Sequence, residues 1–218
     1  MNLYVVVEGE GETTVYPKWI SILNPAISRV FQVNVADHNN YYLISGQGYP
    51  QYLDIVKRAV EDVAINLQYT RLVIAVDSED ASYEQKYDEI DQFVAGLNCR
   101  VQYRIVVQHF CLETWALGNK RIVRRNPSNA QLQEYLALFD TSMTDPELLT
   151  PPEDEELNRA QFAFKYLSLM LREKNSRLIY SKRHPCEIGE EYFFRQIRSR
   201  FETDHHIQSL AGLLTAFV

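Results

Sequence analysis

Two short apolar runs that each end in clustered acids constrain the fold of this chain most strongly. Residues 3–7 are apolar and rich in valine, and residues 8–12 then read Glu-Gly-Glu-Gly-Glu. Residues 72–76 form a second such run, and residues 77–80 read Asp-Ser-Glu-Asp. Continuous apolar runs of this length are typical of strands buried on both faces, as in a parallel sheet. We therefore expect acids at the carboxyl ends of two buried strands, which is where open α/β sheets bind ligands.

The first half of the chain alternates between strand and helix patterns. Besides the two runs above, we predict strands at residues 30–35, 41–44 and 101–107, and helices at residues 13–23, 52–67 and 83–97. Apolar residues recur at the helical period in the second of these helices, whereas residues 30–35 alternate as a strand does. This order predicts an α/β fold with a mostly parallel sheet flanked by helices.

The acids after these strands resemble the pattern of the Toprim domain, which topoisomerases, primases and OLD-family nucleases share. That pattern places a glutamate after the first strand and Asp-x-Asp after the third, and here Glu8, Asp77 and Glu79 match it. OLD-type members add an acid four residues past the first glutamate, where this chain has Glu12. Glu79 departs from the pattern, because it is one methylene longer than aspartate. The resemblance covers about residues 3–115 and implies a Toprim-like fold.

A further motif follows the last predicted strand. Toprim-like proteins of the OLD and related defence groups often carry Glu-x-Trp here, and Glu113 with Trp115 resembles it. By that resemblance Glu113 is a further metal-binding or active-site carboxylate and Trp115 is a packing residue. The alternative is that Glu113 caps the start of a helix or forms a salt bridge there. His109 just before it is more typical of a hydrogen-bonded structural residue than of a substrate contact.

Carboxylates gathered at one edge of a sheet repel one another unless they are protonated or bridged by a cation. The resemblance implies Mg²⁺ or Mn²⁺ as that cation. The expected metal ligands are Glu8, Glu12, Asp77, Glu79 and Asp80, and the expected catalytic residues are Glu8, Asp77, Glu79 and Glu113. Two cations about 4 Å apart would stabilise the entering and leaving oxygens of a displacement at phosphorus. Glu8 could instead act as a general base.

Charge is distributed unevenly along the chain, although the net charge is −7. Residues 1–99 hold 14 acidic and 6 basic residues, whereas residues 157–202 hold 10 basic and 5 acidic residues. The cations that we expect to contact nucleic-acid phosphates are Lys120, Arg121, Arg124, Arg125, Lys182 and Arg183. A nuclease needs both carboxylates for metals and cations for phosphates. The alternative for the segment at residues 120–125 is a solvated loop.

Composition changes divide the chain into three parts. Residues 1–139 are predicted to form the Toprim-like α/β core. Residues 140–156 contain three prolines and are strongly acidic, which is typical of a linker or loop. Residues 157–218 are predicted to form a helical C-terminal extension packed on the core, because apolar residues recur there at the helical period. The apolar residues 207–218 would dock on the core or on a partner.

Several classes of protein are disfavoured. A hydrophobic content of 46% excludes wholesale disorder, and no apolar run approaches the ~20 residues that cross a bilayer. No secretory signal is visible, and three widely spaced cysteines fit a reducing compartment, so we expect a cytoplasmic protein without a membrane partner. The chain carries no Gly-x-x-x-x-Gly-Lys-Ser/Thr motif. By resemblance to phage-defence nucleases, a separate ATPase or sensor protein would therefore be a partner.

The sequence thus predicts a Mg²⁺-dependent nucleic-acid phosphodiesterase with a Toprim active site, and the resemblance implies a role as the effector of a phage-defence system. The first alternative is a catalytically silent Toprim-like subunit that binds a partner or nucleic acid. The second is a small-molecule phosphohydrolase or nucleotidyl transferase. A nuclease should show a groove that joins the acids to the basic segments, and a small-molecule enzyme should show a closed pocket. A silent subunit should show acids that are dispersed or paired with internal arginines. Assembly into a homo-oligomer is compatible with each.

Overall fold

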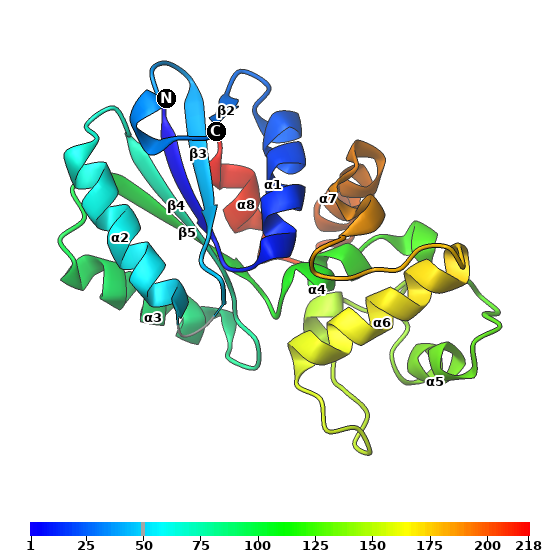
Figure 1. Ribbon diagram of the computed structural model, residues 1–218. Helices are drawn as coiled ribbons and strands as arrows, with labels where there is room; N and C mark the ends of the chain where they lie inside the picture. Colours follow the sequence, from blue (N-terminus) through cyan, green and yellow to red (C-terminus); the bar gives the residue numbers. More distant parts are fainter. Residues whose placement is uncertain (49–50) are drawn as a thin grey trace.

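The computed structural model describes residues 1–48 and 51–218 of the chain. Within that part, the protein folds around a five-stranded sheet with helices on both faces (Figure 1). The strands are β1 (Leu3–Val7), β2 (Ser28–Val30), β3 (Asn40–Ser45), β4 (Arg71–Asp77) and β5 (Gln102–Gln108). All neighbouring strands pair in parallel, in the order β2-β3-β1-β4-β5. The predicted α/β class with a mostly parallel sheet is therefore confirmed, and it is consistent with a Toprim-like fold.

The central position of β1 explains its composition. It pairs with β3 on one side and β4 on the other, and all five of its residues are buried. Helices α2 (Gln51–Ile65) and α3 (Tyr83–Gly96) cover one face of the sheet, where they pack on alternate strand residues such as Val6 and Ile74 (Figure 1). The other face packs against α1 (Glu10–Leu23) and α8 (Leu210–Ala216). A strand enclosed in this way needs apolar residues at every position, since both of its faces are buried.

Two predicted boundaries are wrong. The strand predicted at residues 30–35 ends at Val30, and Val33–Val35 forms a 3₁₀ turn (η1) instead. The alternating pattern misled because this edge of the sheet leaves Phe31 77% exposed, so its apolar side chain does not mark a buried face. Helix α1 begins at Glu10 rather than near Thr13, because Gly9 is extended and serves as its N-cap residue.

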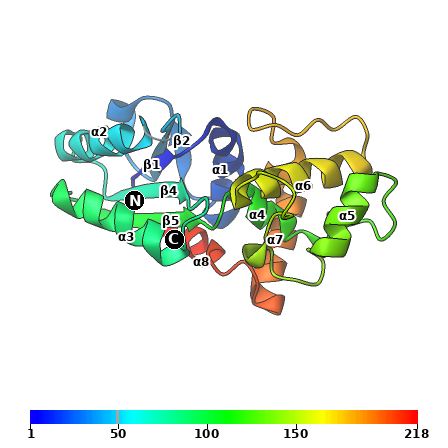
Figure 2. The same cartoon turned by 90° about the horizontal axis from the view of Figure 1, so that it is seen from below.

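The remaining helices form a group beside the sheet (Figure 2). They are α4 (Leu112–Leu117), α5 (Ala130–Leu138), α6 (Arg159–Lys174) and α7 (Glu191–Asp204), with short 3₁₀ turns η2 (Lys120–Ile122), η3 (Pro146–Leu148) and η4 (Cys186–Gly189). Their apolar faces join the core on the α1 face of the sheet. The Trp19 ring of α1 lies 4.8 Å from Phe194 of α7 and 6.3 Å from Trp115 of α4, measured between ring centroids. The C-terminal extension therefore shares one aromatic core with the sheet.

The acidic segment at residues 140–156 is a loop, and hydrogen bonds hold its first part against the helices. The buried guanidinium of Arg200 donates hydrogen bonds to the backbone carbonyls of Thr141, Ser142 and Thr144. The apolar end of the chain also packs internally, because α8 lies on β5 with Leu213 buried. Among the described residues, no helix combines the length and apolar character needed to cross a membrane.

Candidate functional site

Three polar side chains meet where the central strands end. Glu8 directly follows β1, Asp77 is the last residue of β4, and Gln108 is the last residue of β5. Asp77 and Gln108 lie opposite each other in the register of the two strands. All three side chains are buried, with exposed fractions of 8%, 6% and 0%. The parallel sheet thus places polar groups in its own apolar interior, where each of them needs a partner.

Hydrogen bonds join these residues to the first turn of α1. One carboxylate oxygen of Glu8 accepts from the backbone N–H of Asp77 at 2.9 Å. The Gln108 amide nitrogen donates to Asp77 Oδ1 at 2.6 Å and to Glu12 Oε1 at 3.2 Å. The Tyr16 hydroxyl donates to the Gln108 amide oxygen at 3.0 Å, which turns the amide nitrogen towards the acids. Glu8, Glu12 and Asp77 form what we call the acid cluster.

The two glycines of the Glu-Gly-Glu-Gly-Glu sequence allow close approaches to this cluster. A Cβ atom at Gly9 would lie 2.8 Å from Glu12 Oε2. A Cβ atom at Gly11 would lie 2.8 Å from the backbone carbonyl oxygen of Lys182. Both distances are shorter than a carbon atom tolerates. A side chain at position 9 would therefore displace the Glu12 carboxylate, whereas position 11 requires glycine because the backbone of Lys182 cannot move aside as easily. Gly11 therefore admits the loop between α6 and η4, which carries Lys182 to the acids.

Burial and mutual repulsion raise the pKa values of all three carboxyl groups in the acid cluster. Burial raises the pKa of Glu8 to about 7, and the charges of Glu12 and Glu79 add to the effect. Burial likewise raises the pKa of Glu12, and it raises that of Asp77 well above its usual range, with the charge of Glu8 contributing. The cluster is therefore short of positive charge, and a cation could replace its protons.

Lys182 supplies a basic group beside the cluster. Burial opposes its charged form, but the negative charges of Asp77 and Glu113 outweigh burial and raise the pKa of the ammonium group. Its neighbour Arg183 forms an ion pair with the exposed Glu10 at 2.9 Å. Both residues line a groove of about 550 Å³ that lies over the acid cluster. Of the six predicted phosphate-binding cations, these two are placed beside the predicted acids.

Glu113 lies near the cluster but has a different partner. It belongs to the first turn of α4, where it is buried and accepts a hydrogen bond from the Tyr180 hydroxyl at 2.6 Å. The residue at the N-cap of α4 is Cys111, so Glu113 does not cap the helix. Trp115 is fully buried and donates to Ser209 Oγ at 2.7 Å, as a packing residue would.

Glu79 and Asp80 turn towards α6 instead of joining the acid cluster. The backbone of Glu79 is left-handed, with φ of 53°, and its carboxylate accepts from Asn158 Nδ2 at 2.9 Å. Asp80 accepts from the backbone N–H of Arg159 at 3.0 Å, at the start of α6. The structure therefore brings Glu8, Glu12 and Asp77 together and places Glu79 at the edge of a neighbouring cleft. The metal-binding roles of Glu79 and Asp80 stay predictions.

The basic segment at residues 120–125 lies elsewhere. Lys120 forms an ion pair with Asp204 at the end of α7, with 2.5 Å between Nζ and Oδ2. Arg124 donates to the backbone carbonyl of Lys174 at the end of α6, and with Arg125 it lines a separate hollow beside α5. The segment follows α4 in the chain but does not line the groove over the acids. Its contact with nucleic acid also stays a prediction.

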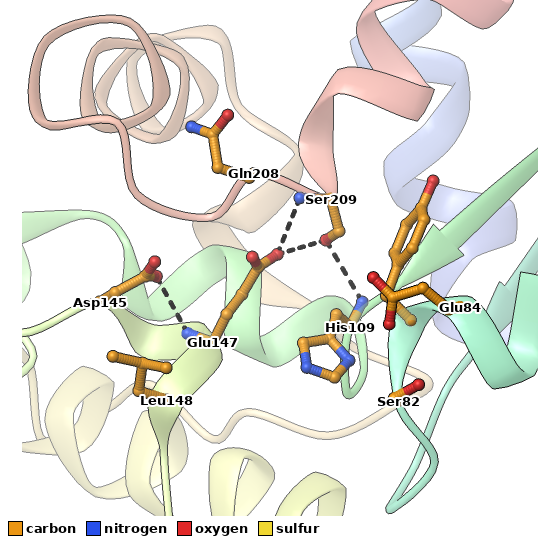
Figure 3. A pocket seen from close by; sticks show the side chains of 9 residues that line it. Ser82, Glu84, His109, Asp145, Glu147, Leu148, Gln208 and Ser209 are labelled. Carbon is orange, nitrogen blue, oxygen red and sulfur yellow. Dashed lines mark hydrogen bonds between the residues drawn. The ribbon is translucent and has the colours of Figure 1, made fainter.

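His109 faces a fourth hollow, of about 470 Å³, which Figure 3 shows from close by. Its Nδ1 atom lies 2.8 Å from Ser78 Oγ. Across this hollow the Glu147 carboxylate accepts from the backbone N–H of Ser209 at 3.0 Å and also from the Ser209 hydroxyl (Figure 3). These contacts tie the 140–156 loop to α8.

The donor set of the acid cluster suits a hard divalent cation. Mg²⁺ prefers oxygen ligands and keeps several of its waters, so that one or two carboxylates and the substrate phosphates commonly hold it. Glu8, Glu12 and Asp77 supply such oxygens in a buried position. In residues 1–48 and 51–218, no three carboxylate, imidazole or thiol groups converge closely enough to form a ligand set by themselves. Water or phosphate oxygens would therefore complete the coordination.

Sequence reasoning missed three residues of this site. Gln108 could have been found, because it is a polar residue at the end of a predicted buried strand. Tyr16 lies one helical turn after Glu12, so its position on the same face of α1 was also predictable. Tyr180 had no local signal, since it reaches Glu113 through a contact between residues 67 positions apart.

Comparison of the chain with protein families, with curated proteins and with solved structures found no match. The resemblance to the Toprim domain therefore depends on the residues named above.

Proposed function

We propose that this protein is a Mg²⁺-dependent nucleic-acid phosphodiesterase with a Toprim-like site. One observation carries the proposal: the acid cluster is buried at the carboxyl ends of two adjacent parallel strands and has few donors of its own. Among the described residues, its donors are the amide of Gln108 and the backbone N–H groups of Asp77 and Glu12. Buried carboxylates that lack partners are costly unless a cation or protons compensate them. Binding of a divalent cation at this site would explain why three carboxylates are buried together.

Each residue of the groove has a role in this proposal. Glu8, Glu12 and Asp77 would hold Mg²⁺ or Mn²⁺. When bound, the cation would polarise a phosphate oxygen and lower the pKa of a water molecule. Lys182 and Arg183 line the same groove and would bind the phosphate by charge. Gln108 orients the carboxylates of Asp77 and Glu12 through its amide nitrogen.

The reaction would be hydrolysis of a phosphodiester. Water adds to phosphorus and loses a proton to the solvent, the bond from phosphorus to the leaving sugar oxygen breaks, and the leaving oxygen takes up a proton from the solvent. We assign Glu113 to orient the attacking water, because this buried carboxylate is held by Tyr180 and lies outside the acid cluster. A separate ATPase or sensor protein as partner remains part of the proposal by resemblance alone.

The contacts of the cluster favour an enzyme over a silent subunit. A silent subunit would disperse the acids or pair them with arginines, whereas Glu12 and Asp77 share a neutral amide and Glu8 accepts from a backbone N–H. The apolar C-terminal end, which would have offered a partner surface, is instead covered by the sheet.

Incubation of the purified protein with labelled single-stranded DNA, duplex DNA and RNA tests the proposal. We expect cleavage with Mg²⁺ or Mn²⁺ and none with EDTA. Asp77→Asn should abolish cleavage, whereas Asp88→Asn, which removes an exposed acid on α3, should retain it. Absence of cleavage with every substrate and either metal would contradict the proposed function. Cleavage by Asp77→Asn at the wild-type rate would contradict the assigned site.

A further inference from the structure

A second cleft adjoins the acid groove on the far side of Lys182. Its volume is about 670 Å³, and it lies between the start of α4, one face of α6 and the Lys182 loop. Cys111 and Glu113 line the cleft from the start of α4. Glu79, in the turn after β4, lines it beside Asn158, which precedes α6. None of the local contacts described above explains why the chain leaves this space open.

The lining from α6 is mainly apolar and follows the helical repeat. Ala160, Phe164 and Ser168 recur at intervals of four residues, and Leu157 and Leu169 extend the same surface. Side chains four residues apart lie on one face of a helix, so they form a continuous wall. Phe164 is only partly buried, and its ring centroid lies 5.4 Å from that of Tyr180. An aromatic ring that is held from one side and open on the other is suited to stacking.

The position of Lys182 connects this cleft to the acid cluster. Lys182 lines both hollows, and Glu113 lines the cleft while its charge acts on Glu12 and Lys182. A phosphate bound at Lys182 would therefore have the acid cluster on one side and an apolar space on the other. The cleft is lined by two acids, Glu79 and Glu113, and by two lysines, Lys165 and Lys182. Lys165 already forms an ion pair with Glu155. Because the lining carries no surplus of positive charge for a second anion, a neutral group fits the cleft better.

We propose that this cleft binds the nucleobase of an unpaired nucleotide next to the phosphate that is cleaved. A nucleobase is flat, neutral and apolar on its faces, and it stacks on aromatic rings. Its polar edge could bond to the Gln161 amide or the Ser168 hydroxyl, which also line the cleft. A paired base cannot enter such a space without leaving the duplex. The inference rests on the proposed function and names its substrate class as single-stranded nucleic acid.

Binding to a cleavage-deficient protein tests the cleft directly. The parent is Asp77→Asn, and the probe is a short single-stranded oligonucleotide that carries 2-aminopurine, whose fluorescence falls when it stacks. Ser168→Trp, added to the parent, would fill the cleft and should weaken binding about tenfold or more and remove the quenching. Arg172→Trp adds the same bulk to an exposed position of α6 and should leave binding within about twofold. Quenching that is absent in the parent, or equal in both tryptophan variants, would overturn the inference.

Cleavage by the wild-type protein separates this inference from the proposed function. We expect single strands to be cut at least about tenfold faster than duplexes, and an abasic nucleotide beside the scissile phosphate to slow cleavage about tenfold. Equal rates on all three substrates would overturn the base site and leave the nuclease intact. If nothing is cleaved, but the 2-aminopurine quenching is present and is lost in Ser168→Trp, the proposed function fails and the base site stands.

Phe164→Ala should lower affinity without blocking the cleft, which gives a second variant should Ser168→Trp not fold.

Discussion

Two groups of acids lie near the carboxyl ends of the strands, one buried and one half-buried, and they differ in what surrounds them. In the acidic segment at residues 140–156, which we call the acid loop, Asp145 accepts from the backbone N–H groups of Glu147 at 3.1 Å and Ile207 at 3.0 Å. Glu147 accepts twice from Ser209, so each acid holds another part of the chain in place (Figure 3). In the acid cluster, three carboxylates accept from the Gln108 amide and from the backbone N–H groups of Asp77 and Glu12, counted over the described residues.

This difference shows that burial of an acid does not by itself indicate catalysis. Burial raises the pKa of Glu8 and of Glu147 to about 7 in both cases. Glu147 nevertheless has a structural task, because it fixes the start of α8 through Ser209. Within residues 1–48 and 51–218, the Glu8 carboxylate accepts a hydrogen bond only from the end of the neighbouring strand, and it lies among other acids. The number of donors supplied by the chain, rather than the pKa, separates the two groups.

The largest effect should follow neutralisation of the acid cluster. Glu8→Gln or Asp77→Asn should lower turnover at least about 1,000-fold, because the charge that holds the cation is lost. The same variants should raise the melting temperature in metal-free buffer, since like-charge repulsion is relieved. Assays with Mg²⁺ and thermal melts with EDTA measure both effects, with Asp88→Asn as the matched control. Full activity of either variant would remove the cluster from the active site.

Glu113→Gln should have the next largest effect. The amide oxygen can still accept from the Tyr180 hydroxyl, so the fold should be unchanged. Turnover should nevertheless fall by about 10–100-fold while Mg²⁺ affinity remains, because a residue that orients water acts in the reaction and not in metal binding. Turnover and melting temperature are measured on the same protein. Normal turnover with a stability loss of about 1 kcal/mol would make Glu113 structural.

Glu147 should affect stability and not turnover. Glu147→Ala removes the acceptor of two Ser209 donors and should lower the free energy of unfolding by about 1–3 kcal/mol. Glu147→Gln keeps an acceptor oxygen and should lower it less. Turnover per folded molecule should remain normal in both variants. Denaturant unfolding and activity assays check this, and loss of turnover in a folded Glu147→Gln would place the acid loop in the catalytic site.

The pH dependence of stability should separate the two groups further. An acid whose pKa is higher in the folded state binds its proton more tightly there, so its stabilisation is complete below the unfolded value and is lost as pH rises. For Glu8 and Glu147 that loss falls between pH values of about 4.5 and 7. Mg²⁺ should reduce the contribution of Glu8 to the pH dependence of the free energy of unfolding. Glu147→Gln should remove the contribution of Glu147, with or without metal. Unfolding curves at several pH values measure this. A pH dependence of the unfolding free energy that is the same with Mg²⁺ and in Glu147→Gln would contradict the assignment.

The smallest effect should come from the basic segment. Replacing Arg121, Arg124 and Arg125 by glutamine should weaken nucleic-acid binding modestly and flatten its salt dependence, because fewer counterions are released. Binding measured at several salt concentrations tests this. An unchanged salt slope would make the segment a solvated loop, as its position away from the groove favours.

Local pattern was enough to predict the sheet and the centre of the site. The buried strands before Glu8 and Asp77 are continuous apolar runs, and parallel strands place their carboxyl ends at one edge. The prediction of a strand at residues 30–35 was wrong because Phe31 and Val35 are exposed at the edge of the sheet. The alternation of apolar and polar residues there does not reflect a buried face.

The parts that could not be predicted depend on tertiary contacts. The turn at Ser78 directs Glu79 towards Asn158, a residue 79 positions away. Lys182 reaches the cluster because its loop packs against Gly11, which only the folded chain shows. The basic segment was associated with the site by closeness in sequence to Glu113, but Lys120 instead pairs with Asp204 of α7.

The central claim is that Glu8, Glu12 and Asp77 bind a divalent cation whereas Glu147 does not. Binding of a divalent cation tests this claim most directly. Calorimetric titration with Mn²⁺ and the rise in Tm with Mg²⁺ would be measured for the wild type, Asp77→Asn and Glu147→Gln. We predict saturable binding and a rise in Tm for the wild type and Glu147→Gln, and neither for Asp77→Asn. Equal binding by Asp77→Asn, or its loss in Glu147→Gln, would contradict the account.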